Sequence, residues 1–302
     1  MVTDGSGCEL AVGVPIVSLR HLKVMGTKTG GDDEEAMHVR RPAVLLLSLA
    51  AVLLLGAAFV VFANREPRSA NASAPDTAEA VPASTPDLPA ESSPAVGALF
   101  LDGAHYCTAS VVHSDQGDVL LTAAHCIHDG EGGDYLAGVT FAPAYHDGVA
   151  PFGFWTVSDE LVAPGWSTSS DPDLDVGFAT AHQAGATKPL ESLVGANTLA
   201  TGTDFEQAIT LTGYPDDSEV PAVCRNTTTR QDTYQLKVDC AGFPTGTSGG
   251  PWVTAPDPKT RLGTVIGVIG GFEYGGDDPD TSYSSYFDTD VQALYRQTAA
   301  RA

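Results

Sequence analysis

Three residues in this chain have the types and the order that covalent hydrolysis needs. Ser248 stands in the run Gly246-Thr247-Ser248-Gly249-Gly250-Pro251, where glycines permit a tight, exposed turn with amide N–H groups facing a substrate oxygen. A serine hydroxyl becomes a nucleophile only beside a base, and that base must be oriented by a third group. His125 follows the apolar run Val119–Leu121, and Asp175 precedes another apolar run. Together they predict acyl transfer to Ser248.

These segments resemble the signatures of the chymotrypsin-like (trypsin-fold) serine peptidases. His125 lies in Thr122-Ala123-Ala124-His125-Cys126, Asp175 opens the stretch Asp-Val-Gly-Phe, and Ser248 lies in Gly-Thr-Ser-Gly-Gly-Pro. The order His, Asp, Ser along the chain is that of this family and differs from subtilisins and α/β-hydrolases. The resemblance covers about residues 96 to 297 and rests on these short motifs.

The resemblance implies a role for each residue. Ser248 would be the nucleophile, His125 the general base and acid, and Asp175 the carboxylate that orients His125. The backbone N–H groups of Gly246 and Ser248 would form the oxyanion hole. Only Asp175 is followed by Val-Gly-Phe, which favours it over two nearby rivals, Asp171 and Asp173.

The sequence departs from trypsin at the residue before the nucleophile. Thr247 stands where trypsin-like zymogens have an aspartate that pairs with a newly cut N-terminus. A threonine cannot form that ion pair, so we expect no activation switch of the trypsin type. Thr247, the short distance of 73 residues from Asp175 to Ser248, and Gly213-Tyr214-Pro215 make the chain more similar to bacterial V8-like (glutamyl-endopeptidase-like) secreted members.

The residues that would determine substrate preference carry no charge. By the resemblance, the base of the primary pocket maps to Gly242, next to Phe243, and its wall includes Gly270 and Gly271. An aspartate at the base would favour Arg or Lys, and a histidine in the wall is typical of glutamyl endopeptidases. Neither is present, so we predict an open pocket for medium or large apolar side chains.

Four of the five cysteines lie in the part of the chain that resembles a peptidase, and they allow three pairings. The resemblance pairs the cysteine after the catalytic histidine with one just upstream, which gives Cys107–Cys126 and leaves Cys224–Cys240. Disulfides indicate an oxidising compartment. The fifth cysteine, Cys8, lies on the other side of a hydrophobic segment.

That hydrophobic segment, residues 43–63, is uncharged and spans about 31 Å as a helix, enough to cross a bilayer. Arg40 and Arg41 precede it, which favours an N-terminus inside and a C-terminus outside. It is either a retained membrane anchor or a cleaved signal peptide. Translation from Met37 would place Arg40, Arg41 and the apolar run in the arrangement of a secretory signal, whereas the length of the run favours the anchor. Either alternative delivers the peptidase-like part outside the cytoplasm.

The chain therefore divides into four parts. Residues 1–42 are a cytoplasmic or mis-assigned extension, depending on whether Met1 or Met37 is the start, and the hydrophobic segment follows. Residues 64–95 are rich in Ala, Pro, Ser and Thr and read as a disordered linker. Residues 96–302 form the predicted peptidase domain.

The sequence pattern of this domain is typical of an all-β protein. Short runs of β-branched and aromatic residues alternate with turn residues. Combined with the resemblance, this predicts two six-stranded antiparallel β-barrels with the active site between them. Apolar residues at helical spacing predict a C-terminal helix within Asp288–Ala300. The eight clearest strand candidates are Ala98–Leu101, Ala109–Val112, Val119–Thr122, Val139–Phe141, Gly153–Val157, Ala208–Thr212, Tyr234–Val238 and Thr264–Ile269.

Composition limits the partners. The net charge is −23, and from Val96 onward 27 acidic residues face 8 basic ones, which excludes nucleic acid as a ligand. We expect a monomer that acts on a protein or peptide and needs no cofactor and no metal. The acidic loops Asp129–Asp134 and Asp277–Asp280 lack EF-hand spacing, and solvated turns explain them better than calcium sites. Two other functions fit the same fold: a catalytically silent binding protein, and ester hydrolysis at the same site.

Overall fold

The computed structural model describes residues 92–302. The predicted extension, the hydrophobic segment, Cys8 and nearly all of the linker lie outside these residues. Ser92, Ser93 and Ala95 are buried, and Ala95 packs in a hydrophobic core. The folded chain therefore begins before Val96, and the last residues of the predicted linker belong to it. Within residues 92–302, no helix is long and apolar enough to cross a membrane.

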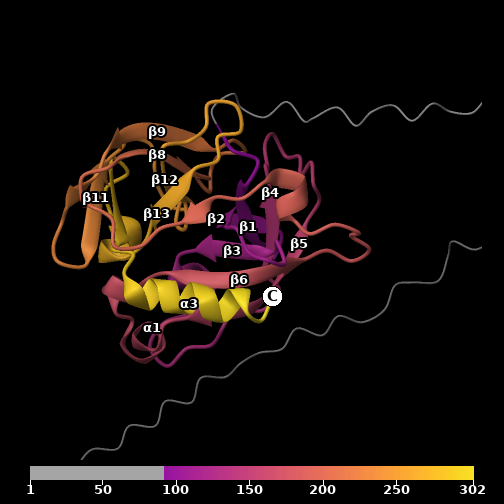
Figure 1. Cartoon of the computed structure of the whole chain (residues 1–302), viewed down its shortest axis with the longest axis horizontal. Helices are drawn as coiled ribbons and strands as arrows, with labels where there is room; N and C mark the ends of the chain where they lie inside the picture. The colour runs from indigo at the N-terminus through magenta and orange to yellow at the C-terminus, as the bar shows by residue number, and fades with distance from the viewer. Residues whose placement is uncertain (1–91) are drawn as a thin grey trace, which may run out of the picture. The chain divides into compact units, whose positions relative to one another are not determined.

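The first half of the domain is a closed antiparallel barrel with strand order β1-β2-β3-β6-β5-β4, as predicted (Figure 1). Successive residues of a strand face opposite sides of the sheet. In β3, Leu120 packs in one core cluster, whereas Val119 and Leu121 pack in another. Both faces of the strand are thus buried. The strands are β1 Val96–Leu101, β2 Ala104–Val111, β3 Val119–Thr122, β4 Thr140–Pro143, β5 Trp155–Val162 and β6 Gly177–His182.

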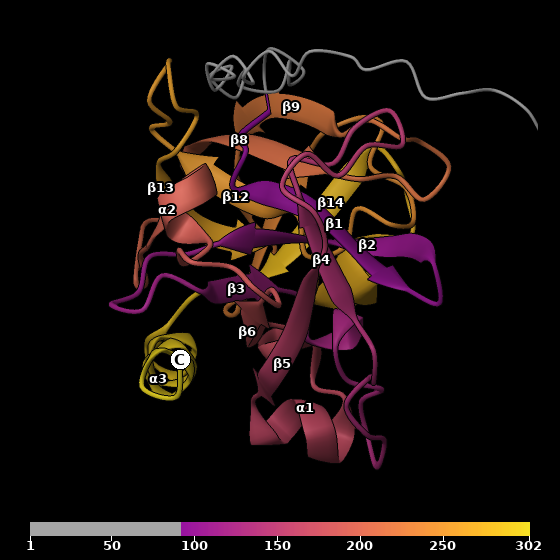
Figure 2. The same ribbon diagram turned by 90° about the vertical axis from the view of Figure 1, so that its right-hand side faces the viewer.

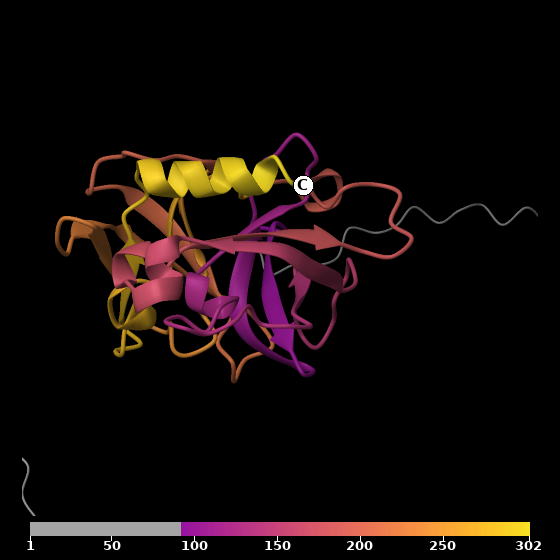
Figure 3. The same ribbon diagram turned by 90° about the horizontal axis from the view of Figure 1, so that it is seen from below.

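The C-terminal helix α3 (Thr289–Ala299) covers the outside of this barrel, against β5 and β6 (Figures 1 and 3). Asp288 caps its N-terminus, because the Asp288 carboxylate accepts the N–H groups of Asp290 and Val291. Val291 and Leu294, three residues apart, are buried in the same core cluster as Val119 and Leu121 of β3. The predicted helix is confirmed, with ends within one residue of those expected.

The second half departs from the prediction, because its strands form two sheets rather than one closed barrel. At one seam, the N–H of Val268 donates to the Ser284 hydroxyl instead of to a backbone carbonyl. At the other, the Cys224–Cys240 disulfide joins the sheets. The seam at Ser284 also has a backbone bond, from the N–H of Gly270 to the carbonyl of Tyr283. Side chains and isolated backbone bonds thus join the two sheets. The five-stranded sheet is β7 Thr198–Leu199, β13 Thr264–Val268, β12 Pro251–Thr254, β8 Ala208–Gly213 and β9 Ala222–Thr227, and the three-stranded sheet is β10 Thr229–Arg230, β11 Gln235–Asp239 and β14 Thr281–Ser285.

Short helical turns fill the connections. The helix α1 follows directly after β5, at the end of the first barrel (Figure 2). Three of the others are single 3-10 turns; η1 contains His125, and Asp175 directly follows η2. The elements are η1 Ala124–Cys126, α1 Pro164–Ser169, η2 Pro172–Leu174, α2 Glu191–Val194 and η3 Phe272–Gly275.

Both predicted disulfides are present. Cys107–Cys126 joins β2 to η1, and Cys224–Cys240 joins β9 to the residue after β11. The sequence separations, 19 and 16 residues, are nearly equal. Removing either bridge should therefore release a similar amount of chain entropy in the unfolded state.

Because the two sequence separations are nearly equal, removing each disulfide in turn separates its effect on stability from its effect on activity. We expect Cys107→Ala/Cys126→Ala and Cys224→Ala/Cys240→Ala each to lower the free energy of unfolding by about 3 kcal/mol, measured by urea denaturation. Only the first should also lower the kcat for a peptide substrate at least tenfold, because Cys126 adjoins His125. Equal losses of kcat in the two variants would contradict a positioning role for Cys107–Cys126.

Candidate active site

The structure brings His125 and Asp175 together. His125 Nδ1 lies 2.8 Å from one carboxylate oxygen of Asp175, and the backbone N–H of His125 donates to the other oxygen at 3.0 Å. The N–H of Gly271 makes a third hydrogen bond to this carboxylate at 2.9 Å. Asp175 is fully buried. A carboxylate only accepts, so the Nδ1–H of His125 donates, and Nε2 is left as the proton acceptor of the neutral ring.

Local structure selects Asp175 over its two rivals. Asp175 ends the turn η2, and its side chain reaches the turn η1 that holds His125. The Asp171 carboxylate instead caps the start of η2 by accepting the N–H of Asp173. The Asp173 carboxylate accepts from the side chain of Gln235. Each rival therefore has a structural partner of its own.

The loop that carries Ser248 is fixed to the first barrel by Thr108. The Thr108 N–H donates to the carbonyl of Ser248 at 2.7 Å, and the Thr108 hydroxyl donates to the carbonyl of Gly246. Thr108 follows Cys107, whose disulfide partner Cys126 follows His125. In the described residues, no hydrogen bond joins the Ser248 hydroxyl to His125, which is common in peptidases without substrate. The connection between Ser248 and His125 therefore runs through the hydrogen bonds of Thr108 and the adjoining disulfide Cys107–Cys126.

Glycine is required on both sides of Thr247-Ser248. Gly249 has φ +80°, and a Cβ there would lie 2.1 Å from the carbonyl oxygen of Thr108 and 2.2 Å from the Thr122 hydroxyl. Gly246 has φ +93°, and a Cβ there would lie 2.4 Å from the N atom of Asp216. Both positions therefore exclude side chains by conformation and by space.

Some N–H groups of the Ser248 loop donate to protein carbonyls and others do not, and the second set suits an oxyanion hole. The N–H of Thr247 donates to the carbonyl of Pro244, and the N–H of Gly249 donates to the carbonyl of Ile269. Within residues 92–302, the N–H groups of Gly246 and Ser248 donate to no acceptor. These are the two donors that the sequence assigned to the oxyanion.

The four predicted pocket residues have different surroundings. Gly242 is exposed, and a Cβ there would meet nothing within 4 Å. Phe243 is buried in the core of the second half. A Cβ on Gly270 would lie 2.9 Å from the Asp175 carbonyl oxygen, and Gly271 donates to the Asp175 carboxylate. Both predicted wall glycines thus lie beside Asp175, and Gly271 bonds to its carboxylate.

Comparison with known proteins identifies the family. Residues 107–268 match the trypsin-like peptidase domain, a span that contains His125, Asp175 and Ser248. The chain belongs to the trypsin-like peptidases. No curated protein sequence matches it.

Solved structures agree with this family. Protease Anisep from Arthrobacter nicotinovorans is 26% identical, matches 70% of this chain and 97% of its own, and has a TM-score of 0.61. The thermostable serine protease AL20 from an extremophilic microorganism is also 26% identical, with 71% and 100% covered and a TM-score of 0.62. A Glu endopeptidase with 17% identity, 68% and 90% coverage and a TM-score of 0.54 shares the fold. These relatives support a serine peptidase that acts on proteins or peptides.

Sequence reasoning missed a buried glutamine that ties this peptidase's site together. The Gln235 amide donates to the carbonyl of Pro172 and to the carboxylate of Asp173, both at 2.9 Å. Its oxygen accepts the N–H of Phe272 at 3.1 Å. Gln235 thereby joins the loop before Asp175 to the wall segment after Gly271. Nothing in its sequence setting, the start of a predicted strand, marks it.

Two aromatic rings beside His125 were also missed. The Tyr274 ring meets the His125 ring edge-on at 5.5 Å, although the residue is 62% exposed. The buried Trp166 lies 6.4 Å from His125 on centroids. Tyr274 and Glu273 both have left-handed backbone conformations, which non-glycine residues seldom adopt. The turn η3 thus holds an exposed aromatic group against His125.

The one cluster of potential metal ligands in residues 92–302 is Cys107, His125 and Cys126. The two sulfur atoms are bonded to each other, so neither is a thiolate ligand. In the loop Asp277–Asp280, the Asp278 carboxylate accepts the N–H of Asp280. That carboxylate therefore supports its own turn.

Substitution of Gln235 tests its positioning role. Gln235→Met keeps most of the volume but removes the acceptor of the Phe272 N–H and a donor to the Asp173 carboxylate, while the Pro172 carbonyl keeps the Ser285 hydroxyl as a donor. We expect kcat to fall about tenfold while KM changes little, because the Asp175 loop loses its tie, and the free energy of unfolding to fall by about 1–3 kcal/mol. Gln183 is the matched control, since its amide also donates to two carbonyls, those of Phe152 and Phe154. If Gln183→Met lowers kcat equally, Gln235 is merely structural.

Proposed function

We propose that this chain is an extracytoplasmic endopeptidase that cleaves peptide bonds through an acyl-enzyme, with Ser248, His125 and Asp175 as its triad. The observation that carries the proposal is the buried Asp175 carboxylate. It accepts two hydrogen bonds from His125 and one from Gly271. Three donors fix the plane of the carboxylate, and the carboxylate fixes the His125 ring with Nε2 available as a base.

In the first step, the Ser248 oxygen attacks the scissile carbonyl carbon and Nε2 of His125 takes the hydroxyl proton. Asp175 stabilises the imidazolium that forms. The carbonyl π electrons move to the oxygen, which receives hydrogen bonds from the N–H groups of Gly246 and Ser248. One such donor contributes about 3 to 4 kcal/mol to transition-state stabilisation.

Collapse of the tetrahedral intermediate breaks the C–N bond. His125 gives its proton to the leaving amine, and an ester to Ser248 remains. Water then attacks this ester with His125 again as the base, which releases the carboxylic acid and restores the serine. The balance is one peptide bond and one water consumed, with no redox change and no cofactor.

The proposed enzyme needs no N-terminal ion pair to form its oxyanion hole. The Thr247 hydroxyl donates to the carbonyl of Pro244 at 2.7 Å, within the same loop. The residue is buried, and its Cβ would lie 2.7 Å from a Cβ placed on Gly213. Hydrogen bonding and packing inside the loop thus take the place of the aspartate pair used by trypsin-like zymogens.

The two disulfides support action outside the cytoplasm, because such bonds persist in oxidising compartments. We further propose a preference for apolar side chains before the scissile bond. The predicted pocket base, Gly242, is open and uncharged, and the wall segment 268–271 lacks the histidine that glutamyl endopeptidases carry near there.

The triad is tested by covalent labelling and kinetics on the full chain. We expect a fluorophosphonate probe to label the wild type and not Ser248→Ala, whose kcat should be lower by about a millionfold. Asp175→Asn should lower kcat by about 10⁴-fold, because the asparagine favours the wrong tautomer of His125.

The matched control for Asp175→Asn is Asp173→Asn. Asp173 is the nearby rival, and an asparagine there can still accept from Gln235. Its kcat should change less than tenfold. Folded wild type that resists the probe would indicate a silent binding protein, and hydrolysis of esters alone would indicate an esterase.

Substrate preference is tested with a peptide library. The expected cleavage profile favours medium and large apolar residues on the acyl side of the cut, since burial of such side chains stabilises the complex without a charged partner. Mass spectrometry of the fragments gives the profile. A profile dominated by Arg, Lys or Glu would contradict the proposed pocket while leaving the triad untouched.

A further inference from the structure

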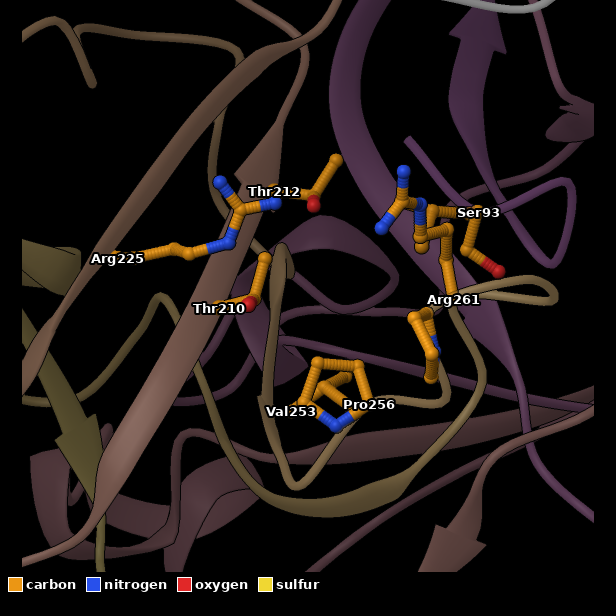
Figure 4. A pocket seen from close by; sticks show the side chains of 9 residues that line it. Ser93, Thr210, Thr212, Arg225, Val253, Pro256 and Arg261 are labelled. Atoms are coloured by element: carbon orange, nitrogen blue, oxygen red, sulfur yellow. The ribbon is translucent and has the colours of Figure 1, made fainter. Parts of the chain in front are cut away.

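A pocket of about 240 Å³ lies where the five-stranded sheet meets the start of β1 (Figure 4). Its lining contains no residue of the triad and none of the turn η3. Arg225 and Arg261, which stand on its walls, each interact already with other groups. The pocket is therefore separate from the contacts that surround His125.

Two aromatic side chains pack against the ring of His125, whose side chain is only 18% exposed. The ring of Trp166, from α1, lies 6.4 Å from that of His125 on centroids. The ring of Tyr274, from η3, lies 5.5 Å from His125 and 6.3 Å from Trp166. Trp166 belongs to the first half of the domain and Tyr274 to the second. Tyr274 thus extends from one half onto two rings of the other.

The two aromatic groups are held in different ways. Trp166 is buried in a core cluster, and its indole N–H donates to the carbonyl of His128 at 3.3 Å. Tyr274 is 62% exposed. Within residues 92–302, the side chains of Tyr274 and Glu273 make no hydrogen bond and no ion pair. Ring contacts therefore hold Tyr274 in place, whereas Trp166 is part of the core.

The segment that carries Tyr274 is strained between two pairs of glycines. Residues 270–276 have the sequence Gly-Gly-Phe-Glu-Tyr-Gly-Gly. Glu273 and Tyr274 have φ of +53° and +54°, which costs energy in residues with side chains. Gly275 and Gly276 have φ of +109° and +129°, a region that glycine alone adopts readily. Hinges are formed by a few residues that absorb large changes of φ and ψ, and these glycines can do so.

The chain on both sides of this segment is fixed. The N–H of Gly270 donates to the carbonyl of Tyr283 in β14 at 3.0 Å, and the ring of Phe272 packs edge-on against the Tyr283 ring at 5.0 Å. Beyond the second glycine pair, the carbonyl of Asp280 accepts the N–H of Cys240 at 2.9 Å. A change of conformation can therefore be confined to the few residues around Tyr274.

We propose that residues 270–276 are a flap that caps His125 in the free protein, with Tyr274 as the cap, and that the flap opens when a substrate binds. Opening loses two ring contacts and releases the strain at Glu273 and Tyr274. The two conformations are thus close enough in energy for a bound substrate to select the open one. The consequence for catalysis rests on the proposed function, in which His125 takes the proton of Ser248, and a closed flap shields that base until substrate arrives.

The cap is tested by the reactivity of the His125 ring in the full chain. Diethyl pyrocarbonate acylates an unprotonated imidazole nitrogen, and peptide mass spectrometry gives the rate at each histidine. We expect Tyr274→Ala to raise the rate at His125 at least threefold, because the ring that shields it is gone. The rate at His113, whose side chain is 60% exposed, should be the same in both proteins. An unchanged rate at His125 would overturn the proposal.

Two matched variants separate the cap from general effects. Tyr274→Phe keeps the ring and removes a hydroxyl that has no hydrogen-bond partner in residues 92–302, so His125 should react at the wild-type rate. Tyr234→Ala removes another exposed tyrosine of the second half and should also leave that rate unchanged. Circular dichroism checks that all variants are folded. A rise in either control equal to that in Tyr274→Ala would contradict the capping role of the Tyr274 ring.

Covalent labelling tests the opening and distinguishes it from the proposed function. The second-order rate of fluorophosphonate labelling at Ser248 should rise at least threefold in Tyr274→Ala, since no closed flap has to open first. An unchanged or slower rate would overturn the proposal, because the ring would then leave access unaffected or hold the ligand. Absence of labelling in both proteins would refute the proposed peptidase activity, and the diethyl pyrocarbonate rates would still decide whether Tyr274 caps His125.

Discussion

The contact of the Ser248 loop with Thr108 is the interaction on which the site depends. Thr108 belongs to the first barrel and holds the carbonyls of Gly246 and Ser248. The neighbouring Cys107 holds Cys126, next to His125. The anchors of His125 and of the Ser248 loop are thus adjacent in one strand. Because Gly249 leaves no space for a Cβ against this strand, the two halves of the domain meet at backbone distance and their relative position is closely fixed.

The Asp175 carboxylate also fixes the relative position of the two halves, through electrostatics. A buried carboxylate is costly unless hydrogen bonds replace its water. Here the donors come from both halves, with His125 in the first and Gly271 in the second. Separation of the halves would leave the carboxylate short of a donor. Gln235 reinforces the arrangement, because its side chain bonds to the loop before Asp175 and to the segment after Gly271. The orientation of the His125 ring and the packing of the two halves are therefore coupled.

Sequence reasoning succeeded where chemistry demands particular residues at fixed short spacing. It predicted the pairing of His125 with Asp175, both disulfides, the first barrel and the C-terminal helix. It failed where a contact depends on side chains that meet only in three dimensions. The strand β14 (Thr-Ser-Tyr-Ser-Ser) has no apolar run to mark it, and its Ser284 replaces a ladder bond at the seam of the second half. The role of Gln235 likewise depends on hydrogen bonds to Pro172, Asp173 and Phe272, which are distant in the sequence.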